Sequence, residues 1–183
     1  MMHRRISRDP KPLMLLFSLG LLLGSCSKKE AAPTIDFGPE EGFSYRSAGN
    51  VPIGAQDLTD WTLDTKWNQQ EKDLFKSLGL NLDDENKVPA TAIFIAGYPN
   101  PATSAISFRY ALPSAAMAKV LVVDNHYQVL QEVNATPPNQ YFTFMLDLTT
   151  GKFEKGQRYR FYYVLYNNPS YLYLKGHGDF KMQ

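Results

Sequence analysis

The second half of the chain alternates apolar and polar residues with a period of two, and this feature most constrains the fold. In residues 106–110, Ile106, Phe108 and Tyr110 alternate with Ser107 and Arg109. This pattern is typical of a β-strand that buries one face. Comparable short runs, separated by turn residues, occupy 90–98, 119–123, 128–133, 142–146, 158–166, 171–174 and 179–182. No helix fits between them, so a parallel α/β fold is excluded.

One segment before these strands has a helical pattern instead. Asn68 is followed three residues later by Glu71, which is the spacing of a capping box, and Gly79 is well placed to end a helix. Trp67, Leu74, Phe75 and Leu78 share one face at helical spacing. Together with the strands, this helix predicts a mainly β chain. We expect a seven-stranded antiparallel immunoglobulin-like sandwich with one short N-terminal helix.

The first 25 residues are typical of a secretion signal. Arg4, Arg5, Arg8 and Lys11 precede an almost purely apolar run, 13–23. A helix of that length rises about 16 Å, which is too short to span a bilayer core of about 30 Å. The run ends in Leu23-Gly24-Ser25-Cys26, which closely resembles the lipobox of bacterial lipoproteins. The resemblance implies cleavage before Cys26 and lipid attachment to its thiol, so the membrane is an expected partner.

The residues around Cys26 support the same interpretation. Cys26 is the only cysteine in the chain, so an internal disulfide is impossible and acylation accounts for a lone exported thiol. Ser27 stands where lipoproteins retained at the inner membrane often have Asp, so the resemblance implies the outer membrane, on its periplasmic or cell-surface side. Lys28-Lys29-Glu30 allows two interpretations: a partial surface-export signal, or a plain solvated tether.

Composition divides the chain into four segments. We expect a lipoprotein signal peptide over 1–25, a flexible tether over 26–50, a helical appendage over 51–89 and the sandwich over 90–183. The part from Cys26 onward has 15 Lys and Arg residues against 17 Asp and Glu residues. Because there is no basic excess to neutralise phosphates, nucleic acid is not an expected partner.

A second resemblance begins at the string Tyr98-Pro99-Asn100-Pro101-Ala102-Thr103. It continues through 106–110, through Leu112-Pro113 and through 118–124. These strings resemble the C-terminal sorting domains of the Bacteroidota type IX secretion system and the related immunoglobulin-like domain of flagellar hook-capping proteins. The two prolines are expected to end one strand and to send the next strand into the opposite sheet.

The chain also departs from those families. They usually have Gly and then a basic residue where this chain has Tyr127 and Gln128. Because tyrosine resists the left-handed conformation that glycine allows, we expect this hairpin to turn in another way. The ending 176–180 does not match the basic tail of a sorting signal, and a lipobox would be a competing address. The resemblance therefore implies the fold and not the secretion role.

Residue sets that would indicate a chemistry are missing from the sequence. The only cysteine is assigned to lipid, no serine has the context of a nucleophile, and His126 and His177 have no third ligand at metal spacing. We expect no catalytic site, no metal and no cofactor. The expected function is a non-catalytic binding or structural module of the cell envelope, with another envelope protein or a glycan as partner.

Tyrosines near the C-terminus are the candidate binding residues. Alternation places Tyr159, Phe161 and Tyr163 on one face of a strand, and Tyr162 and Tyr166 on the other. Two interpretations remain for the second face. In the first, the helix near Trp67 covers it, or the tyrosines lie at the surface with their hydroxyls in water. In the second, Tyr162, Tyr166, Tyr171 and Tyr173 form a surface platform for a glycan or a protein.

Overall fold

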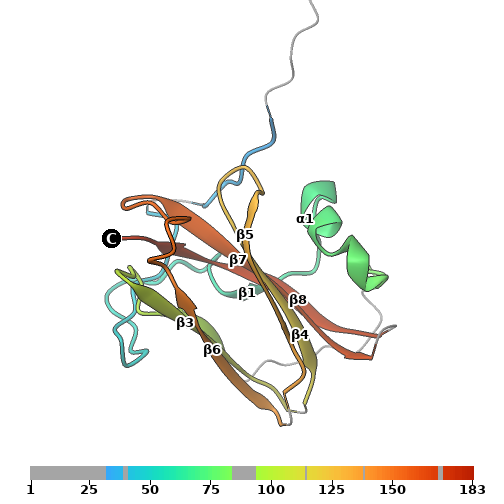
Figure 1. Ribbon diagram of the computed structural model, residues 1–183. Helices are drawn as coiled ribbons and strands as arrows, with labels where there is room; N and C mark the ends of the chain where they lie inside the picture. The colour runs from blue at the N-terminus through green and yellow to red at the C-terminus, as the bar shows by residue number, and fades with distance from the viewer. Residues whose placement is uncertain (1–31, 39–40, 84–93, 114, 138, 169–170) are drawn as a thin grey trace, which may run out of the picture. The chain divides into compact units, whose positions relative to one another are not determined.

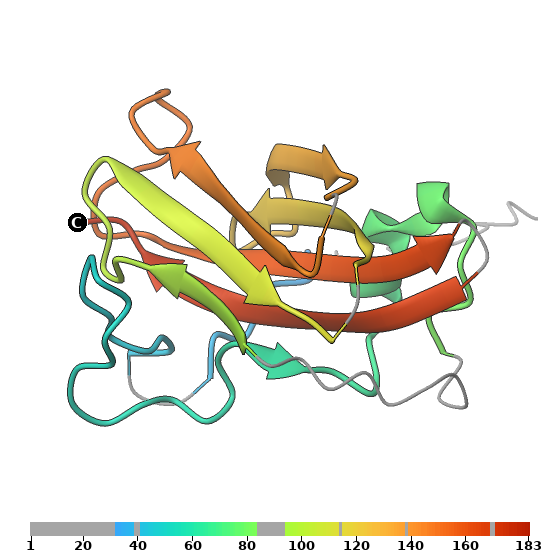
Figure 2. The ribbon, with the colours of Figure 1, turned by 90° about the horizontal axis from the view of Figure 1, so that it is seen from below.

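A computed structural model describes residues 32–38, 41–83, 94–113, 115–137, 139–168 and 171–183, all within one compact unit. Its strands form two antiparallel sheets (Figures 1 and 2). The three-stranded sheet has the order β2-β3-β6, with β2 at Phe94–Tyr98, β3 at Ala105–Ala111 and β6 at Tyr141–Asp147. The five-stranded sheet has the order β1-β8-β7-β4-β5. Its strands are β1 (Thr62–Leu63), β4 (Met117–Val123), β5 (Val129–Ala135), β7 (Arg158–Asn168) and β8 (Tyr171–Lys181).

The order of the seven strands β2 to β8 confirms the predicted immunoglobulin-like sandwich. Strands β2, β3 and β6 form one sheet, which faces β4, β7 and β8 in the other. Two details differ from expectation. The two-proline turn returns β3 alongside β2 in the same sheet, so the expected switch of sheets is wrong. The expected last segment, 179–182, is largely the end of the continuous strand β8, and β1 adds an eighth strand beside it.

The space between the sheets is filled mainly by aromatic rings. Phe108 on β3 and Phe161 on β7 lie 5.6 Å apart between ring centroids. The predicted alternation of β7 is confirmed, since Tyr159, Phe161 and Tyr163 all belong to this core. Trp61, which precedes β1, adds its ring to the same core, 5.6 Å from Phe161. Gly97 on β2 and Gly178 on β8 flank that ring, because a Cβ at either position would overlap it.

The predicted helix is present as α1 (Gln69–Leu74), followed by the 3-10 turn η1 (Lys76–Leu78). Asn68 and Glu71 form the expected capping box, and Gly79 ends η1 with a left-handed φ of 65°. The helix packs on the outer face of the five-stranded sheet, on the opposite side of that sheet from β3 and β6 (Figure 1). Trp67 and Phe75 provide the contact, and both are buried.

The expected flexible tether is wrong for its second half. Ile35 and Phe37 are 6% exposed and pack with Trp67 and Tyr162 on the outer face of the five-stranded sheet. The backbone N–H of Ile35 donates to the carbonyl of Asn125 at 2.8 Å. Phe43 is also buried, so the described parts of the expected tether and appendage, within 32–83, belong to the folded domain. The apolar residues at 35, 37 and 43 were the signal for this packing.

The hairpin between β4 and β5 also differs from expectation. Tyr127 adopts the left-handed conformation, with φ of 62°, which a bulky side chain rarely does. Its ring stacks on Tyr162 at 6.4 Å and 14°, and its hydroxyl accepts from Asn68 at 3.3 Å. Asp124 Oδ1 accepts from the N–H groups of His126 and Gln128 and closes the turn. These contacts stabilise the strained residue, so the hairpin takes a left-handed conformation at Tyr127 and the expectation that it avoids one is wrong.

Candidate binding surface

The residues singled out in the sequence fall into three groups. Leu23, Gly24, Ser25 and Cys26 lie outside the described residues. Tyr162 is fully buried in the apolar cluster on the outer face of the five-stranded sheet, and Tyr166 is half-buried against that cluster. The backbones of Tyr171 and Tyr173 belong to β8, but their side chains lie outside what the structure describes.

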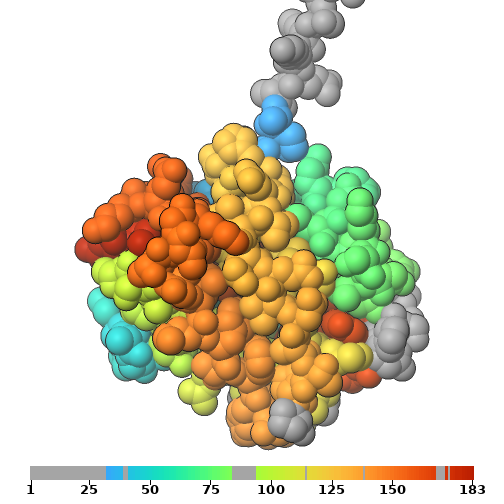
Figure 3. All heavy atoms as spheres, in the orientation of Figure 1, coloured from blue at the N-terminus to red at the C-terminus, as the bar shows by residue number. Residues whose placement is uncertain are grey.

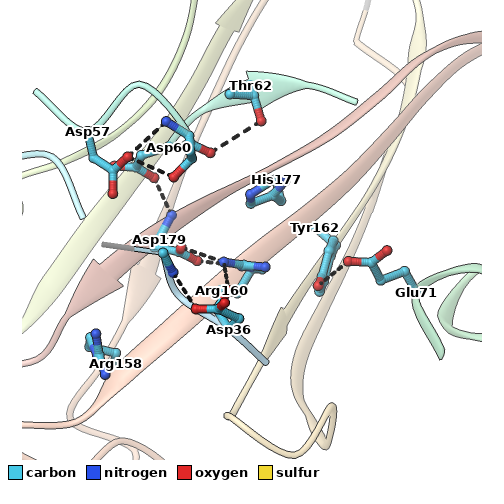
Figure 4. Close-up of polar contacts among 12 residues, drawn as sticks. Asp36, Asp57, Asp60, Thr62, Glu71, Arg158, Arg160, Tyr162, His177 and Asp179 are labelled. Atoms are coloured by element: carbon cyan, nitrogen blue, oxygen red, sulfur yellow. Dashed lines mark hydrogen bonds and ion pairs between the residues drawn. The ribbon is translucent and has the colours of Figure 1, made fainter. Parts of the chain in front are cut away.

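Tyr162 is buried because the N-terminal part of the domain covers it, which corrects the platform interpretation for this residue. Trp67 packs edge-on against its ring at 5.6 Å. The Tyr162 hydroxyl donates to Glu71 at 2.9 Å (Figure 4). The alternative in which the helix near Trp67 covers this face is therefore confirmed for Tyr162.

The same covered face buries a network of charged side chains (Figure 4). Arg160 on β7 makes a bidentate pair with Asp179 on β8, at 2.6 and 2.7 Å. The guanidinium also donates to the backbone carbonyl of Asp36 at 2.9 Å. His177 Nδ1 lies 2.7 Å from Asp64, next to β1. Charges this deeply buried require partners, and here several partners come from residues 36–64. The network therefore fastens this segment to the sheet.

Asp60 makes the central contact between the segment 36–64 and the five-stranded sheet. Its two carboxylate oxygens accept from the backbone N–H of Asp179 at 2.5 Å and of Ser44 at 2.6 Å. Desolvation by burial outweighs these hydrogen bonds and, with the nearby charge of Asp179, raises the pKa of Asp60 to about 7. Burial also raises the pKa of Asp179, against the opposing effect of Arg160. Because the network is buried and internally paired, it serves to hold the segment in place.

The outer face of the three-stranded sheet is different, and we call it the β2-β3-β6 face. Strand register places its outward side chains in three rows that cross all three strands, and a fourth pair, Ala105 and Asp147, extends the face on β3 and β6 alone. The outer rows run Phe94, Ala111, Tyr141 and Tyr98, Ser107, Met145, while the middle row runs Ala96, Arg109, Thr143. Large side chains therefore occupy the four corners, small ones lie between them, and Arg109 is at the centre.

The corner residues are accessible to different degrees. Met145 is 73% exposed and Tyr141 is 53% exposed, while Phe94 and Tyr98 are half-buried. Figure 3 shows one side of the molecule, where the orange atoms of β6 lie at the surface. Strand β6 is an edge strand of its sheet, so its outward residues are accessible from two directions.

Arg109 has an unusual environment for a residue at the centre of a sheet face. Its guanidinium lies 5.9 Å from the ring centroid of Phe94, a cation–π contact. It makes no hydrogen bond or ion pair with any residue that the structure describes. None of its five N–H donors is therefore used within the described part of the chain.

Sequence reasoning missed the β2-β3-β6 face, although a signal was present. In 141–147, Phe142, Phe144 and Leu146 alternate with the residues between them, and Leu146 is a buried core residue. The same alternation places Tyr141 and Met145 outward, where polar residues are the norm. Large apolar residues in the outward register were the available clue.

The described residues contain neither a helix that could span a membrane nor a cluster of metal ligands. No helix in the described part of the chain is long and apolar enough to cross a membrane. Among the same residues, no cluster of three or more His, Cys, Asp or Glu side chains could hold a metal ion.

Comparisons with known proteins identify no family. No family model matches the chain, and no curated protein matches it. Among solved structures, it is similar to the crystal structure of a bromine derivative of BhCBM56, a carbohydrate-binding module. The match has 15% sequence identity and a TM-score of 0.35, and it covers 50% of this chain and 90% of that one. A likeness at this level carries no argument about what this chain binds.

Proposed function

We propose that this protein is an exported lipoprotein, anchored to the outer membrane through Cys26, whose sandwich is a non-catalytic binding module of the cell envelope. The β2-β3-β6 face is its binding surface. One observation carries the proposal. The chain covers the outer face of its five-stranded sheet with its own residues, yet on the other sheet it leaves Tyr141 and Met145 more than half exposed.

The composition of the β2-β3-β6 face supports a role in binding. Tyr, Phe, Met and Arg are the residues enriched in the buried cores of protein interfaces, where Lys, Glu and Asp are depleted. All four types occur here on three neighbouring strands, and the centre contains no acidic side chain. Tyr141 and Met145 are large side chains exposed on this face, and exposed apolar surface of this kind supports a role in binding a partner.

The glycan-binding alternative changes its residues. Tyr162 is buried in the covered face, so it offers no ring to a sugar. Tyr141 is the exposed aromatic residue that a glycan platform would need instead, with Tyr98 in the opposite corner. A protein partner and a glycan therefore compete as explanations of the same face.

The anchor and the binding surface need separate tests. For the anchor, Cys26→Ala should abolish labelling by a radioactive fatty acid and release the protein from washed membranes, with the sandwich still folded by circular dichroism. Retention of the variant on membranes after detergent-free washing would contradict the anchor.

For the surface, a variant with both Tyr141→Ala and Met145→Ala is compared with Leu58→Ala, a matched change at an exposed loop residue that is 89% accessible. Because these side chains are exposed, all variants should keep wild-type stability. Chemical cross-linking on intact cells should show adducts of the wild type and of Leu58→Ala that the double variant lacks. Identical adducts from all three proteins would show that the face is not the binding surface.

A further inference from the structure

We infer that the β2-β3-β6 face binds a protein segment that places a carboxylate on Arg109, with apolar side chains around it. This inference rests on the proposed function and identifies the class of partner. The observations that carry it are the central position of Arg109, its lack of a polar partner among the described residues, and the four large corner residues around it.

The charge of Arg109 determines what the partner must present. An occupant that covers the face removes water from the guanidinium, and a buried charge without a partner is strongly destabilising. A carboxylate matches the planar fork of Arg in a bidentate arrangement. The acidic residue of the face, Asp147, lies two rows away from Arg109, so the anionic group at the centre must come from the occupant.

A second copy of the chain does not fit this requirement. Two identical faces pack about a twofold axis, and the residues close to that axis meet their own symmetry-related counterparts. Since Arg109 is at the centre of the face, such a dimer would oppose two guanidinium groups without an acid between them. Like charges in contact disfavour that association.

The corners favour a polypeptide over a glycan. The ring of Phe94 already has the Arg109 guanidinium over it, so that ring is not free to stack on a sugar. Met145, the most exposed of the four, has no hydrogen-bonding hydrogen for sugar hydroxyls, but its flexible thioether adapts to varied apolar side chains. Apolar corners around a charged centre also resemble the arrangement in which near-neutral contacts shield a central hot spot from water.

The dimensions of the face limit the length of the contact. Two strand spacings separate Phe94 from Tyr141, about 10 Å, and four residues separate Phe94 from Tyr98, about 14 Å. An extended peptide of about four residues crosses the longer dimension. A surface of this size is smaller than one side of a standard protein interface, so we expect a short segment and reversible binding.

The test uses the full mature lipoprotein in detergent micelles and three matched pools of immobilised decapeptides. Each peptide has the same apolar flanks around a central Glu, a central Gln or a central Lys. The proteins are the wild type, Arg109→Gln, the Tyr141→Ala and Met145→Ala double variant, and Leu58→Ala as the control. A glycan array and sedimentation velocity, applied to the same proteins, report on carbohydrate binding and self-association.

We expect the wild type and Leu58→Ala to bind Glu peptides at least tenfold more tightly than Gln peptides, and Lys peptides least. In Arg109→Gln the preference for Glu should disappear, and in the double variant binding to all pools should fall. Equal binding to the three pools that still depends on Tyr141 and Met145 would overturn the inference and leave the proposed function intact. Glycan binding or a dimer that the double variant abolishes would have the same consequence. If the double change alters no interaction of any kind, both the inference and the proposed binding surface are wrong.

Discussion

Gly178 on β8 provides a sharp test of how the sandwich closes around Trp61. The glycine faces the core, paired with Phe161 on β7, and its φ is not in the left-handed region. Replacing a strand glycine with alanine should by itself stabilise the chain by roughly 0.5–1 kcal/mol, because the unfolded state loses freedom. We predict that Gly178→Ala instead destabilises the protein, because the new methyl group overlaps ring carbons of Trp61.

The magnitude follows from what the ring would lose. Gly97 borders the same ring, so Trp61 has no free space into which it can shift. The ring must leave the core and give up its contacts with Phe161 at 5.6 Å and Phe108 at 6.1 Å. Truncating a buried Phe or Trp costs about 3–5 kcal/mol, and because Trp61 is only partly buried we expect about 3 kcal/mol.

A double-mutant cycle distinguishes this mechanism from a general intolerance of alanine. In Trp61→Ala the space beside Gly178 is empty, so adding Gly178→Ala should cost nothing further. Urea unfolding monitored by circular dichroism gives the free energy of unfolding of the four proteins. If the two single losses add in the double variant, or if Gly178→Ala alone is as stable as the wild type, the close packing of Trp61 on Gly178 is wrong.

Three further predictions concern the covered side of the sandwich. The pKa of Asp60 is raised from 3.8 to about 7 in the folded state, so its contribution to stability is fully present below pH 3.8 and is lost as pH rises through 7. Urea titrations should show that the free energy of unfolding falls by about 2–3 kcal/mol between pH 5 and pH 8, and by less in Asp60→Asn. An equal fall in the variant would contradict the assignment of this pH dependence to Asp60. At Tyr127, where φ is 62°, Gly should be more stable than Ala by about 1–2 kcal/mol, since both lack the ring but only Ala is strained; equal unfolding midpoints would refute this. Asn68→Ala removes the cap of α1 and should lower the free energy of unfolding by about 1 kcal/mol, with Gln69→Ala as a control that leaves the cap intact.

Local patterns predicted most of the secondary structure. Alternation or a short apolar run between turn residues marked the seven strands of the sandwich, although β8 was expected as two segments, and the Asn68–Glu71 spacing marked the start of the helix. Both signals act over a few residues, so they are readable without knowledge of the rest of the chain. The short strand β1 has only two residues and depends on pairing with β8, more than a hundred positions later, so no local pattern could reveal it.

Contacts between residues far apart in the sequence explain the wrong predictions at the candidate sites. Tyr162 and Arg160 are in the outward register of β7, where a sandwich normally meets water, but residues 35–82 bury them. The left-handed Tyr127 depends on the same covering, because its ring stacks on Tyr162 and its hydroxyl meets Asn68. Of the aromatic residues that the sequence offered as a platform, Tyr162 and Tyr166 are therefore packing residues. The exposed Tyr141 is instead in β6, which the sequence did not single out.

The covering segment also separates the proposed anchor from the proposed binding surface. Ile35 is the first residue that packs on the domain, and it packs on the outer face of the five-stranded sheet. The β2-β3-β6 face is on the other side of the sandwich, across two layers of strands. Nine residues lead from Cys26 to Ile35, a reach of at most about 30 Å. The chain from Cys26 would thus join the domain at Ile35, on the covered side, and not at the face that holds Arg109, Tyr141 and Met145. Lengthening this tether with Gly-Ser residues after Ala31 should therefore leave peptide binding to the face unchanged, and a gain in binding by the anchored protein would show that the membrane obstructs the face.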